Sequence, residues 1–378
     1  MPIAPARATA AEREHLVREF VELCEIESPS GRERTVAEAV AGRLRAAGAK
    51  VEADGSGGET GSDSGNLLSR IPGPDGAPTV LLAAHLDTVP LEAPVEVARE
   101  DGYLSNRNRA VLGADNKAAV AVLLAVARRA QAHGAPVGLE LLFTTCEERA
   151  LAGAKALDPS WLRADFGFVF DHASPIGELI MAAPTYYAID ARFRGRAAHA
   201  GIRPEDGHSA IAAAAAAISR MPLGRVDRDT TANAGVIEGG TAPNVVAEHC
   251  RVALEARSLD HDRASALAQE LVDAALAGAS DHECDVETDV EQRFRGYRMS
   301  RSQRPVEVAG EALSALGIEP SHVTTGGGSD ANVFNLRGLP CLNVANGTEH
   351  NHEPDERVSV GALEAGLDVA LEIVRRSA

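Results

Sequence analysis

The sequence predicts an α/β domain that is interrupted by a smaller, inserted α+β domain. Short apolar runs alternate with helical segments at both ends of the 378-residue chain, which is typical of a sheet sandwiched between helix layers. From about residue 183 the pattern changes to alternating strands, and the first pattern returns after about residue 294. We therefore expect residues 1–183 and 294–378 to form one domain and residues 184–293 to form the insert.

The elements of the first domain follow from apolar runs and from turn residues. Residues 11–48 have helical composition, with a break at the Ser-Pro-Ser-Gly sequence of residues 28–31. Residues 54–65 are rich in Gly, Ser and Asp and predict a surface loop. Four short apolar runs predict buried strands, and two longer segments predict helices. The strands are residues 79–84, 139–144, 166–170 and 341–344, and the helices are residues 116–132 and 306–316.

The insert has its own order of elements. Alternation of apolar and polar residues predicts strands, and alanine-rich segments predict helices. The expected elements are strand 186–193, helix 209–220, strand 234–237, strand 245–256, helix 263–276 and strand 284–290. This β-α-β-β-α-β order is that of a ferredoxin-like domain.

Composition limits the class of protein and its partners. The apolar fraction of 45% and the charged fraction of 24% are those of a globular protein. No run approaches the ~18 apolar residues of a membrane span, and the first 13 residues lack a secretory pattern. Five scattered cysteines indicate reduced thiols and a cytoplasmic location. A formal charge of −18 argues against nucleic acid and anionic membranes as partners.

Residues that can bind metal follow the predicted strands. His85 ends the first run, Glu147 and Glu148 follow the second, Asp171 follows the third, and His352 lies shortly after the fourth. Asp115 stands just ahead of the helix that begins near residue 116. Because ligands bind outside the carboxyl ends of strands in open α/β sheets, we expect these segments to meet at one edge.

These residue types suit a catalytic zinc centre. Zinc takes imidazole nitrogen and carboxylate oxygen, and two His with three carboxylates suffice for two ions if one carboxylate bridges. Asp87 lies two residues after His85, so it can accept the second imidazole N–H. Glu147 and Glu148 are adjacent and must point differently, so one can bind metal while the other takes a proton from water.

Several motifs together resemble one family of enzymes. They are His85 to Pro90, Gly113 to Lys117, Glu147-Glu148, residues 171–177 and residues 352–356. They are similar to the zinc exopeptidases and deacylases, a family that includes peptidase T, carboxypeptidase G, aminoacylase and acetylornithine deacetylase. The resemblance implies His85 and Asp171 on one metal, Glu148 and His352 on the other, a bridging Asp115, and Glu147 as general base. It also implies a zinc-exopeptidase α/β/α sandwich whose insert is a lid and dimerisation domain, and hence a homodimer.

The segment that begins at Asp171 favours one branch of this family. Residues 171–179 and 327–335 are similar to peptidase T, whereas deacylases and carboxypeptidases tend to carry Glu at the position of Asp171. The resemblance implies an aminopeptidase for short peptides, in which a metal-bridging hydroxide attacks the peptide carbonyl. A deacylase or carboxypeptidase acting on N-acyl amino acids is the alternative enzyme, and a non-catalytic metal- or peptide-binding protein is a third hypothesis. Zinc is the expected metal, with cobalt and manganese as alternatives.

Other residues are implied as substrate contacts by the same resemblance. His199, in the insert, is expected to steady the oxyanion, in its own or the partner's site. Asn244 and Arg257 are expected to bind substrate, the latter through a bidentate fork, with a structural ion pair as its alternative. Gly327 and Gly328 can offer N–H groups to an anionic substrate end, or form an ordinary turn. His350 competes with His352 as ligand, and Cys146, Arg149 and Ala150 depart from the family's pattern.

Overall fold

The chain divides into two units at residues 181/182 and 297/298 in the computed structural model, which describes residues 6–378. The first unit contains Met1–Met181 and Arg298–Ala378, and the second contains Ala182–Tyr297. The limits expected from sequence lie two and four residues away, at 183 and 293. The expected absence of a secretory pattern falls partly on residues 1–5, which lie outside the described residues.

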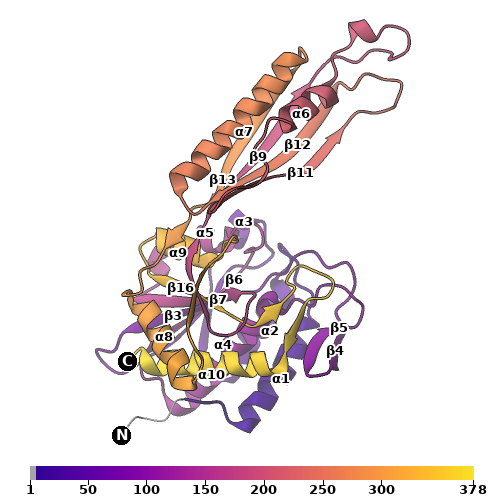
Figure 1. Cartoon of the computed structure of the whole chain (residues 1–378). Helices are drawn as coiled ribbons and strands as arrows, with labels where there is room; N and C mark the ends of the chain where they lie inside the picture. Colours follow the sequence, from indigo (N-terminus) through magenta and orange to yellow (C-terminus); the bar gives the residue numbers. More distant parts are fainter. Residues whose placement is uncertain (1–5) are drawn as a thin grey trace. The chain divides into compact units, whose positions relative to one another are not determined.

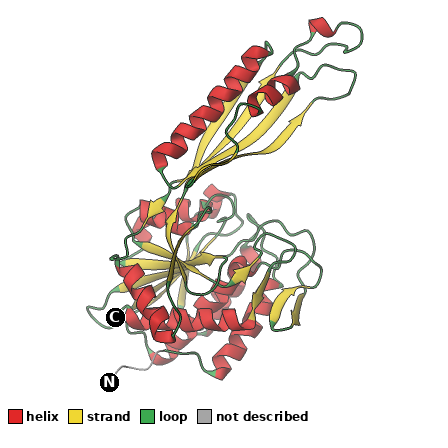
Figure 2. Cartoon of the chain, in the orientation of Figure 1, coloured by secondary structure: helices red, strands yellow, loops and turns green. Residues whose placement is uncertain are grey.

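A nine-stranded sheet forms the centre of the first unit (Figures 1 and 2). Its order is β1-β2-β6-β3-β7-β16-β8-β14, and β15 pairs with β8. The strands are β1 Lys50–Ala53, β2 Leu67–Ile71, β3 Thr79–His85, β6 Gly138–Thr144, β7 Phe166–His172, β8 Glu178–Ala183, β14 Tyr297–Arg298, β15 Ser321–Thr324 and β16 Cys341–Ala345. The strands β6, β3, β7 and β16 are parallel to their neighbours in this series. All four predicted apolar runs lie in these parallel strands.

Helices cover both faces of this sheet, so the predicted α/β/α fold class is confirmed. In Figure 1, α5 and α9 lie on one side of the sheet, and α4, α8 and α10 lie on the other. The helices of this unit are α1 Ala10–Cys24, α2 Arg34–Ala46, α3 Gly57–Thr60, α4 Ala114–His133, α5 Ala152–Ala156, η1 Pro159–Trp161, α8 Arg304–Leu316, α9 Asp330–Leu336 and α10 Val360–Arg376. The central helix α4 is buried along most of its length and packs on β3, α1 and α10. Its alanines allow this close approach.

A small antiparallel sheet lies beside the main one. Its order is β17-β18-β5-β4, formed by β4 Val97–Glu100, β5 Tyr103–Asn106, β17 Thr348–Glu349 and β18 Arg357–Ser359. The loop between β17 and β18 contains His352. Pairing of Val358 with Leu104 anchors this loop to a part of the chain about 250 residues away.

The second unit has the predicted ferredoxin-like order with one added strand. Its elements are β9 Thr185–Arg194, η2 Pro204–Asp206, α6 Ala210–Ile218, β10 Gly224–Asp227, β11 Thr230–Gly239, β12 His249–Ser258, α7 His261–Asp281 and β13 Asp285–Phe294. The sheet order is β10-β11-β12-β9-β13. The alanine-rich face of α6 and the inner face of α7 close its core through residues such as Ala213, Ala217 and Leu271.

Two local predictions were wrong. The strand predicted from residue 245 begins only at His249, because residues 244–246 bond to another loop instead: Ala200 N–H donates to Asn244 O, and Val246 N–H donates to Ala198 O. The loop predicted at residues 54–65 contains the single helical turn α3.

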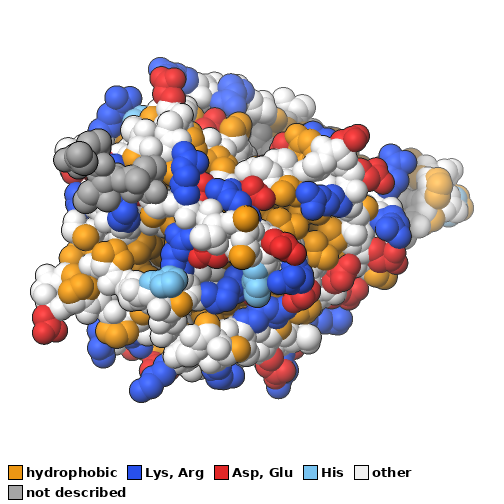
Figure 3. Space-filling model, turned by 90° about the horizontal axis from the view of Figure 1, so that it is seen from below, with side chains coloured by type: hydrophobic (Ala, Val, Ile, Leu, Met, Phe, Trp, Pro, Cys, Tyr) orange, Lys and Arg blue, Asp and Glu red, His pale blue; other side chains and the backbone are white. Residues whose placement is uncertain are grey.

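The face of the molecule in Figure 3 mixes basic and acidic side chains rather than gathering one sign. The ion pair Arg376–Glu311 at 3.1 Å is an example of such mixing. Among the described residues, none of the helices is both long enough and apolar enough to cross a membrane.

Candidate metal centre

Three predicted site segments lie at the ends of neighbouring strands. His85 is the last residue of β3, Asp171 is the last but one of β7, and Glu147 and Glu148 follow β6. Because β3 runs parallel to both β6 and β7, the carboxyl ends of all three meet at one edge of the sheet. The start of α4 contributes Asp115, whose peptide bond to the next residue is cis.

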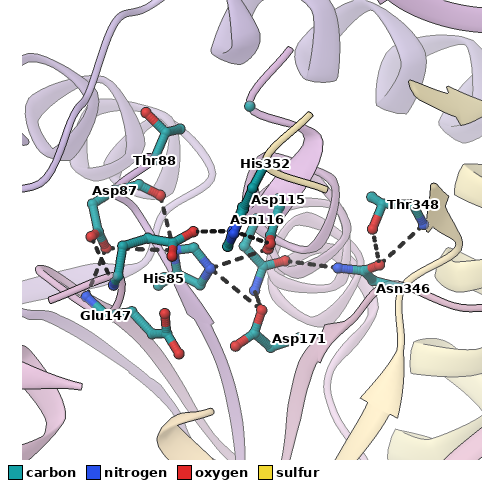
Figure 4. A network of polar contacts seen from close by, with 12 residues as sticks. His85, Asp87, Thr88, Asp115, Asn116, Glu147, Asp171, Asn346, Thr348 and His352 are labelled. Carbon is teal, nitrogen blue, oxygen red and sulfur yellow. Dashed lines mark hydrogen bonds and ion pairs between the residues drawn. The ribbon is translucent and has the colours of Figure 1, made fainter. Parts of the chain in front are cut away.

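The first group of possible ligands surrounds the buried imidazole of His85. Its Nε2 lies 3.2 Å from Asp115 Oδ1 and 3.4 Å from Asp171 Oδ1 (Figure 4). One ligand atom from each of these three residues lies within 4.8 Å of the others. Imidazole and carboxylate groups at such separations can share one divalent cation.

The second group surrounds His352. Its Nε2 lies 2.7 Å from Glu148 Oε1 and 3.3 Å from Asp115 Oδ2. Asp115 therefore faces one group with Oδ1 and the other with Oδ2, which is the geometry that a bridging carboxylate requires. His350 lies apart, with its Nδ1 near Glu353 at 3.6 Å, so the structure brings His352 rather than His350 to Asp115.

A buried glutamate that sequence reasoning missed holds the segment before Asp115. Glu356 is 1% exposed, and its carboxylate accepts the amides of Leu112, Gly113 and Asp115 at 2.7, 2.8 and 2.9 Å. One side chain thus ties the segment of the bridging carboxylate to the loop of His352. The residue stood at the end of a matched motif, and its position there was the available signal.

A chain of side-chain amides, also missed, orients Asp171. Asn116 Nδ2 donates to Asp171 Oδ1 at 3.3 Å, and Asn346 Nδ2 donates to Asn116 Oδ1 at 3.3 Å (Figure 4). Asn343 bonds both the N–H and the C=O of Asp171, at 3.1 and 3.0 Å. Asn343 and Asn346 lie in and just after an apolar run, where a buried amide requires partners.

The Asp87 carboxylate has different partners from those expected. The Nδ1 of His85 is 2.9 Å from the main-chain oxygen of Asp87 and 3.4 Å from its Oδ1, so the closer contact is to the backbone. The carboxylate itself accepts the amide of Glu147 at 2.9 Å, the amide of Glu148 at 3.2 Å and the hydroxyl of Ser30 at 2.6 Å. Asp87 therefore fixes the pair of glutamates as well as the region of the imidazole.

Glu147 is nearly buried beside these groups, with 8% of its surface exposed. Burial, and next the charge of Asp171, raise the pKa of Glu147 well above its usual range, and a raised pKa suits a group that must take up a proton. Asp330 is a further buried carboxylate that sequence reasoning did not single out. Its Oδ2 accepts the hydroxyl of Thr144 at 2.6 Å, and burial raises its pKa to about 6.

The charges of the site fit cations. Hydrogen bonds to Asp115 and Glu148 raise the pKa of His352 to about 10. Burial lowers the pKa of His85, but Asp171 and Asp115 outweigh it and raise this pKa above its usual value. Burial raises the pKa of Asp171 to about 7. Positive charge is thus strongly favoured at both imidazoles, and the hard oxygen and borderline nitrogen donors suit zinc-like ions.

The insert brings two of its predicted residues onto adjacent segments. His199 and Val245 form an isolated bridge, and Ala200 N–H donates to Asn244 O at 3.0 Å. Both His199 and Asn244 are exposed. The Nδ1 of His199 accepts the N–H of Gly201 at 3.2 Å, which assigns the imidazole proton to the exposed Nε2.

The remaining predicted contacts have structural partners. Arg257 forms an ion pair with Glu255 at 3.1 Å and stacks over the ring of Tyr186 at 4.2 Å. The structure therefore contains the ion pair that was the alternative to a substrate contact. The N–H of Gly327 donates to Thr325 Oγ1 at 3.1 Å. Gly328 lies beside it, half-buried, in the loop before α9.

The fold and the site together define a class of protein. An α/β sandwich holds two imidazole–carboxylate groups that share Asp115, with a buried carboxylate beside them, at the sheet edge where ligands bind. This combination is that of a metal-dependent hydrolase.

Comparison with known proteins identifies the family. Residues 81–376 match Peptidase family M20/M25/M40. The structure of aminopeptidase PepT from Bacillus cereus ATCC 10987 is 35% identical, with a TM-score of 0.87 over 97% of this chain and 98% of its own. A tripeptidase from Staphylococcus aureus subsp. aureus Mu50 is 33% identical, with a TM-score of 0.92 over 97% and 98%. YXEP from Bacillus subtilis, a dinuclear metal-binding peptidase of family M20, shares the fold at 16% identity and a TM-score of 0.74 over the same shares.

The chain therefore belongs to Peptidase family M20/M25/M40 and to its peptidase T-like branch. It is a hydrolase of the metallopeptidase class, in a family that includes dinuclear metal-binding enzymes. The predicted family, fold class and enzyme class are confirmed.

Proposed function

We propose that this protein is an aminopeptidase that removes residues from short peptides, with tripeptides as the first substrates to test. The observation that carries the mechanism is Asp115, which faces His85 with one oxygen and His352 with the other, beside the buried carboxylate of Glu147. The substrate class is supported by the similarity to a PepT aminopeptidase and a tripeptidase over 97% of the chain.

Two divalent cations, most simply zinc, would complete the site. His85 and Asp171 would hold one cation, Glu148 and His352 the other, and Asp115 both. Bound there, the cations would polarise the scissile carbonyl and make a water molecule more acidic. Cobalt or manganese would suit the same donors, so metal content is a primary measurement.

Glu147 would move the proton. Its carboxylate takes the proton of the attacking water and passes it to the leaving amine. The amide of Glu147 is fixed on Asp87 Oδ1 at 2.9 Å, which holds the backbone of the general base in place while Glu148, the next residue, serves as ligand.

Replacement of Glu147 tests this role. We expect Glu147→Ala to keep two bound metals per chain and to lose at least 10²-fold in kcat, the lower range for a general base. Metal analysis by mass spectrometry and a tripeptide assay measure both. An undiminished kcat in this variant would exclude the mechanism.

A substrate panel separates the two candidate enzymes. The aminopeptidase should cleave tripeptides with a free amine and leave the N-acetylated forms intact. A deacylase or carboxypeptidase would cleave the N-acyl amino acids or the blocked peptides instead. The presence of Asp171 where deacylases tend to carry Glu favours the first outcome.

His199 would steady the oxyanion of the reacting carbonyl. Because its Nδ1 accepts the Gly201 N–H, its exposed Nε2–H is available to donate. Asn244, Arg257, Gly327 and Gly328 are proposed as further substrate contacts. For Arg257 this requires that the guanidinium bind substrate while it stays stacked over the ring of Tyr186.

Mixed dimers test which site His199 serves. A His199→Ala subunit keeps Glu147, and a Glu147→Ala subunit keeps His199. If His199 acts in the partner's site, a proven heterodimer of the two inactive variants regains one working site. If it acts in its own subunit, the heterodimer stays inactive.

The outer edge of β11 is the proposed dimer contact. Its start, Thr230 to Ala232, pairs with β10, whereas among the described residues no strand pairs with the outer edge beyond Ala232. Val236 and Ile237 are 40% and 53% exposed on this stretch, and Ile211 of α6 is 41% exposed. An open apolar strand edge invites pairing with another chain. Light scattering should show a dimer that Ile237→Lys converts to monomer, and an unchanged dimer would place the contact elsewhere.

We place the protein in the cytoplasm. All five cysteines are unpaired in the structure, and four of them are buried, which is the usual state of thiols in a reducing compartment.

A further inference from the structure

A second buried glutamate, Glu33, lies next to the turn that carries the proposed general base. Its side chain is fully buried and accepts four neutral donors. Its Oε1 accepts Gly31 N–H at 2.9 Å, Cys146 N–H at 3.0 Å and the Cys146 thiol at 3.2 Å, and its Oε2 accepts the Ser62 hydroxyl at 2.5 Å. A buried carboxylate requires such donors, and two of these four belong to Cys146.

Cys146 is the point at which the chain turns away from β6. Its φ of +53° lies in the left-handed region, which a side chain with Cβ adopts only when its surroundings hold it there. After it, Leu151 N–H donates to Glu147 O at 2.7 Å and Ala152 N–H donates to Cys146 O at 3.0 Å. The turn therefore sets the direction in which Glu147 leaves the sheet edge.

Three successive amides of this turn are held by buried carboxylates. The N–H of Cys146 is on Glu33, and those of Glu147 and Glu148 are on Asp87. The two acceptors are themselves joined through one loop, since Ser30 donates to Asp87 and the adjacent Gly31 donates to Glu33. Residues 28–31, which sequence analysis treated as a helix break, and the nearby Glu33 thus form the support of the glutamate pair.

The thiol contributes to this contact as a donor. The sulfur lies 3.2 Å from Glu33 Oε1, so the thiol can donate its proton to the carboxylate.

We propose that Glu33 is a positioning residue of the reaction, which fixes the left-handed turn at Cys146 and thereby the direction of the Glu147 carboxylate. The inference rests on the proposed role of Glu147 as general base. Glu33 acts through the backbone and touches neither substrate nor the metal ligands. Its loss should therefore slow turnover without weakening substrate or metal binding.

Three variants test this role. Glu33→Ala removes every acceptor, and we expect kcat to fall 10- to 100-fold, KM to change less than threefold, and two metals per chain to remain. Glu33→Gln can keep its oxygen on the three Oε1 donors and turn its NH₂ toward Ser62 Oγ, so kcat should return to within threefold of the wild-type value. Glu140→Ala is the matched control, since Glu140 is equally buried and also accepts two amides, of Arg163 and Ala164, at the far end of β6. It should lower the melting temperature and leave kcat within twofold.

The outcomes separate this inference from the proposed function. A wild-type kcat in folded Glu33→Ala, loss of its metals, or a Glu33→Gln variant as slow as Glu33→Ala would each overturn the positioning role. An equal loss of kcat in Glu140→Ala would reduce the effect to general destabilisation. If Glu147→Ala, measured alongside, stays active, the proposed base itself is wrong. If Glu147→Ala is inactive and Glu33→Ala is not, only the present inference fails.

Discussion

Replacement of Asp87 by asparagine should damage stability and turnover together. The side chain is fully buried and accepts Glu147 N–H, Glu148 N–H and the Ser30 hydroxyl. Asparagine has the same shape but one fewer acceptor, and it adds two donors. Whichever way the amide turns, its NH₂ group faces the N–H of one of the two glutamates.

The expected magnitude follows from these contacts. If the NH₂ group takes the place of Oδ2, the Ser30 hydroxyl can accept from it, but the Glu148 amide is left buried and unpaired. Such a group costs about 1–3 kcal/mol, so we expect the free energy of unfolding to fall by about 2 kcal/mol. Displacement of the glutamate pair should also lower kcat by about 10- to 100-fold, since small misplacements of catalytic groups have effects of this size.

Denaturant unfolding and steady-state kinetics measure the two effects on the metal-saturated protein. Glu140→Gln is the control, because its NH₂ group must face either the amides of Arg163 and Ala164 or the Nε–H of Arg70. It should lose similar stability and keep its kcat. Asp87→Asn with wild-type kcat and full metal content would refute the idea that Asp87 positions the glutamates.

Two other predictions concern the metals. In Glu356→Gln the NH₂ group must face either the amides of Leu112 and Gly113 or the amide of Asp115. The dissociation constant of at least one cation, measured by competition with a chelator, should therefore rise tenfold or more. An unchanged affinity would show that Glu356 does not hold the bridging ligand in place. Since the pKa of His352 is raised to about 10 in the metal-free protein, this imidazole is protonated at pH 7 and must lose its proton to bind a cation. Metal binding measured calorimetrically in buffers of different ionisation enthalpy should release protons at pH 7, and affinity should weaken as pH falls; binding without proton release would contradict the ligand role of His352.

The fold was predictable wherever burial dictates composition. The parallel strands β3, β6, β7 and β16 are covered on both faces, so they read as continuous apolar runs. The short strands β1, β4 and β18 are partly exposed and carry mixed residues, so no periodicity marks them. Residues 245–248 have strand composition, but pairing with the His199 loop diverts them. Only the tertiary structure reveals that competition.

The ligand set was predictable for a different reason. His85, Glu147, Glu148 and Asp171 each follow a recognisable strand, and parallel strands bring their carboxyl ends together. The supporting residues could not be found in this way, because their partners are main-chain amides far along the chain. Glu33 and Cys146 are 113 residues apart, and Glu356 and Leu112 are 244 apart. Apart from the place of Glu356 at the end of a matched motif, nothing in the local sequence distinguishes them from exposed acids.

The choice of neutral partners for these acids has a physical reason. Asp87, Glu33 and Glu356 are held by amides, hydroxyls and a thiol, whereas Glu140 of the same sheet is held in part by Arg70 at 2.9 Å. An arginine bonded directly to one of these carboxylates would neutralise its negative charge, and the field of that arginine would be only weakly screened in the buried interior. Neutral donors fix the position of a carboxylate and leave its charge in place. The neutral donors therefore hold the geometry of the site, and the buried Lys117, whose charge interacts with Glu356, donates to the main-chain oxygen of Ile26 rather than to a carboxylate.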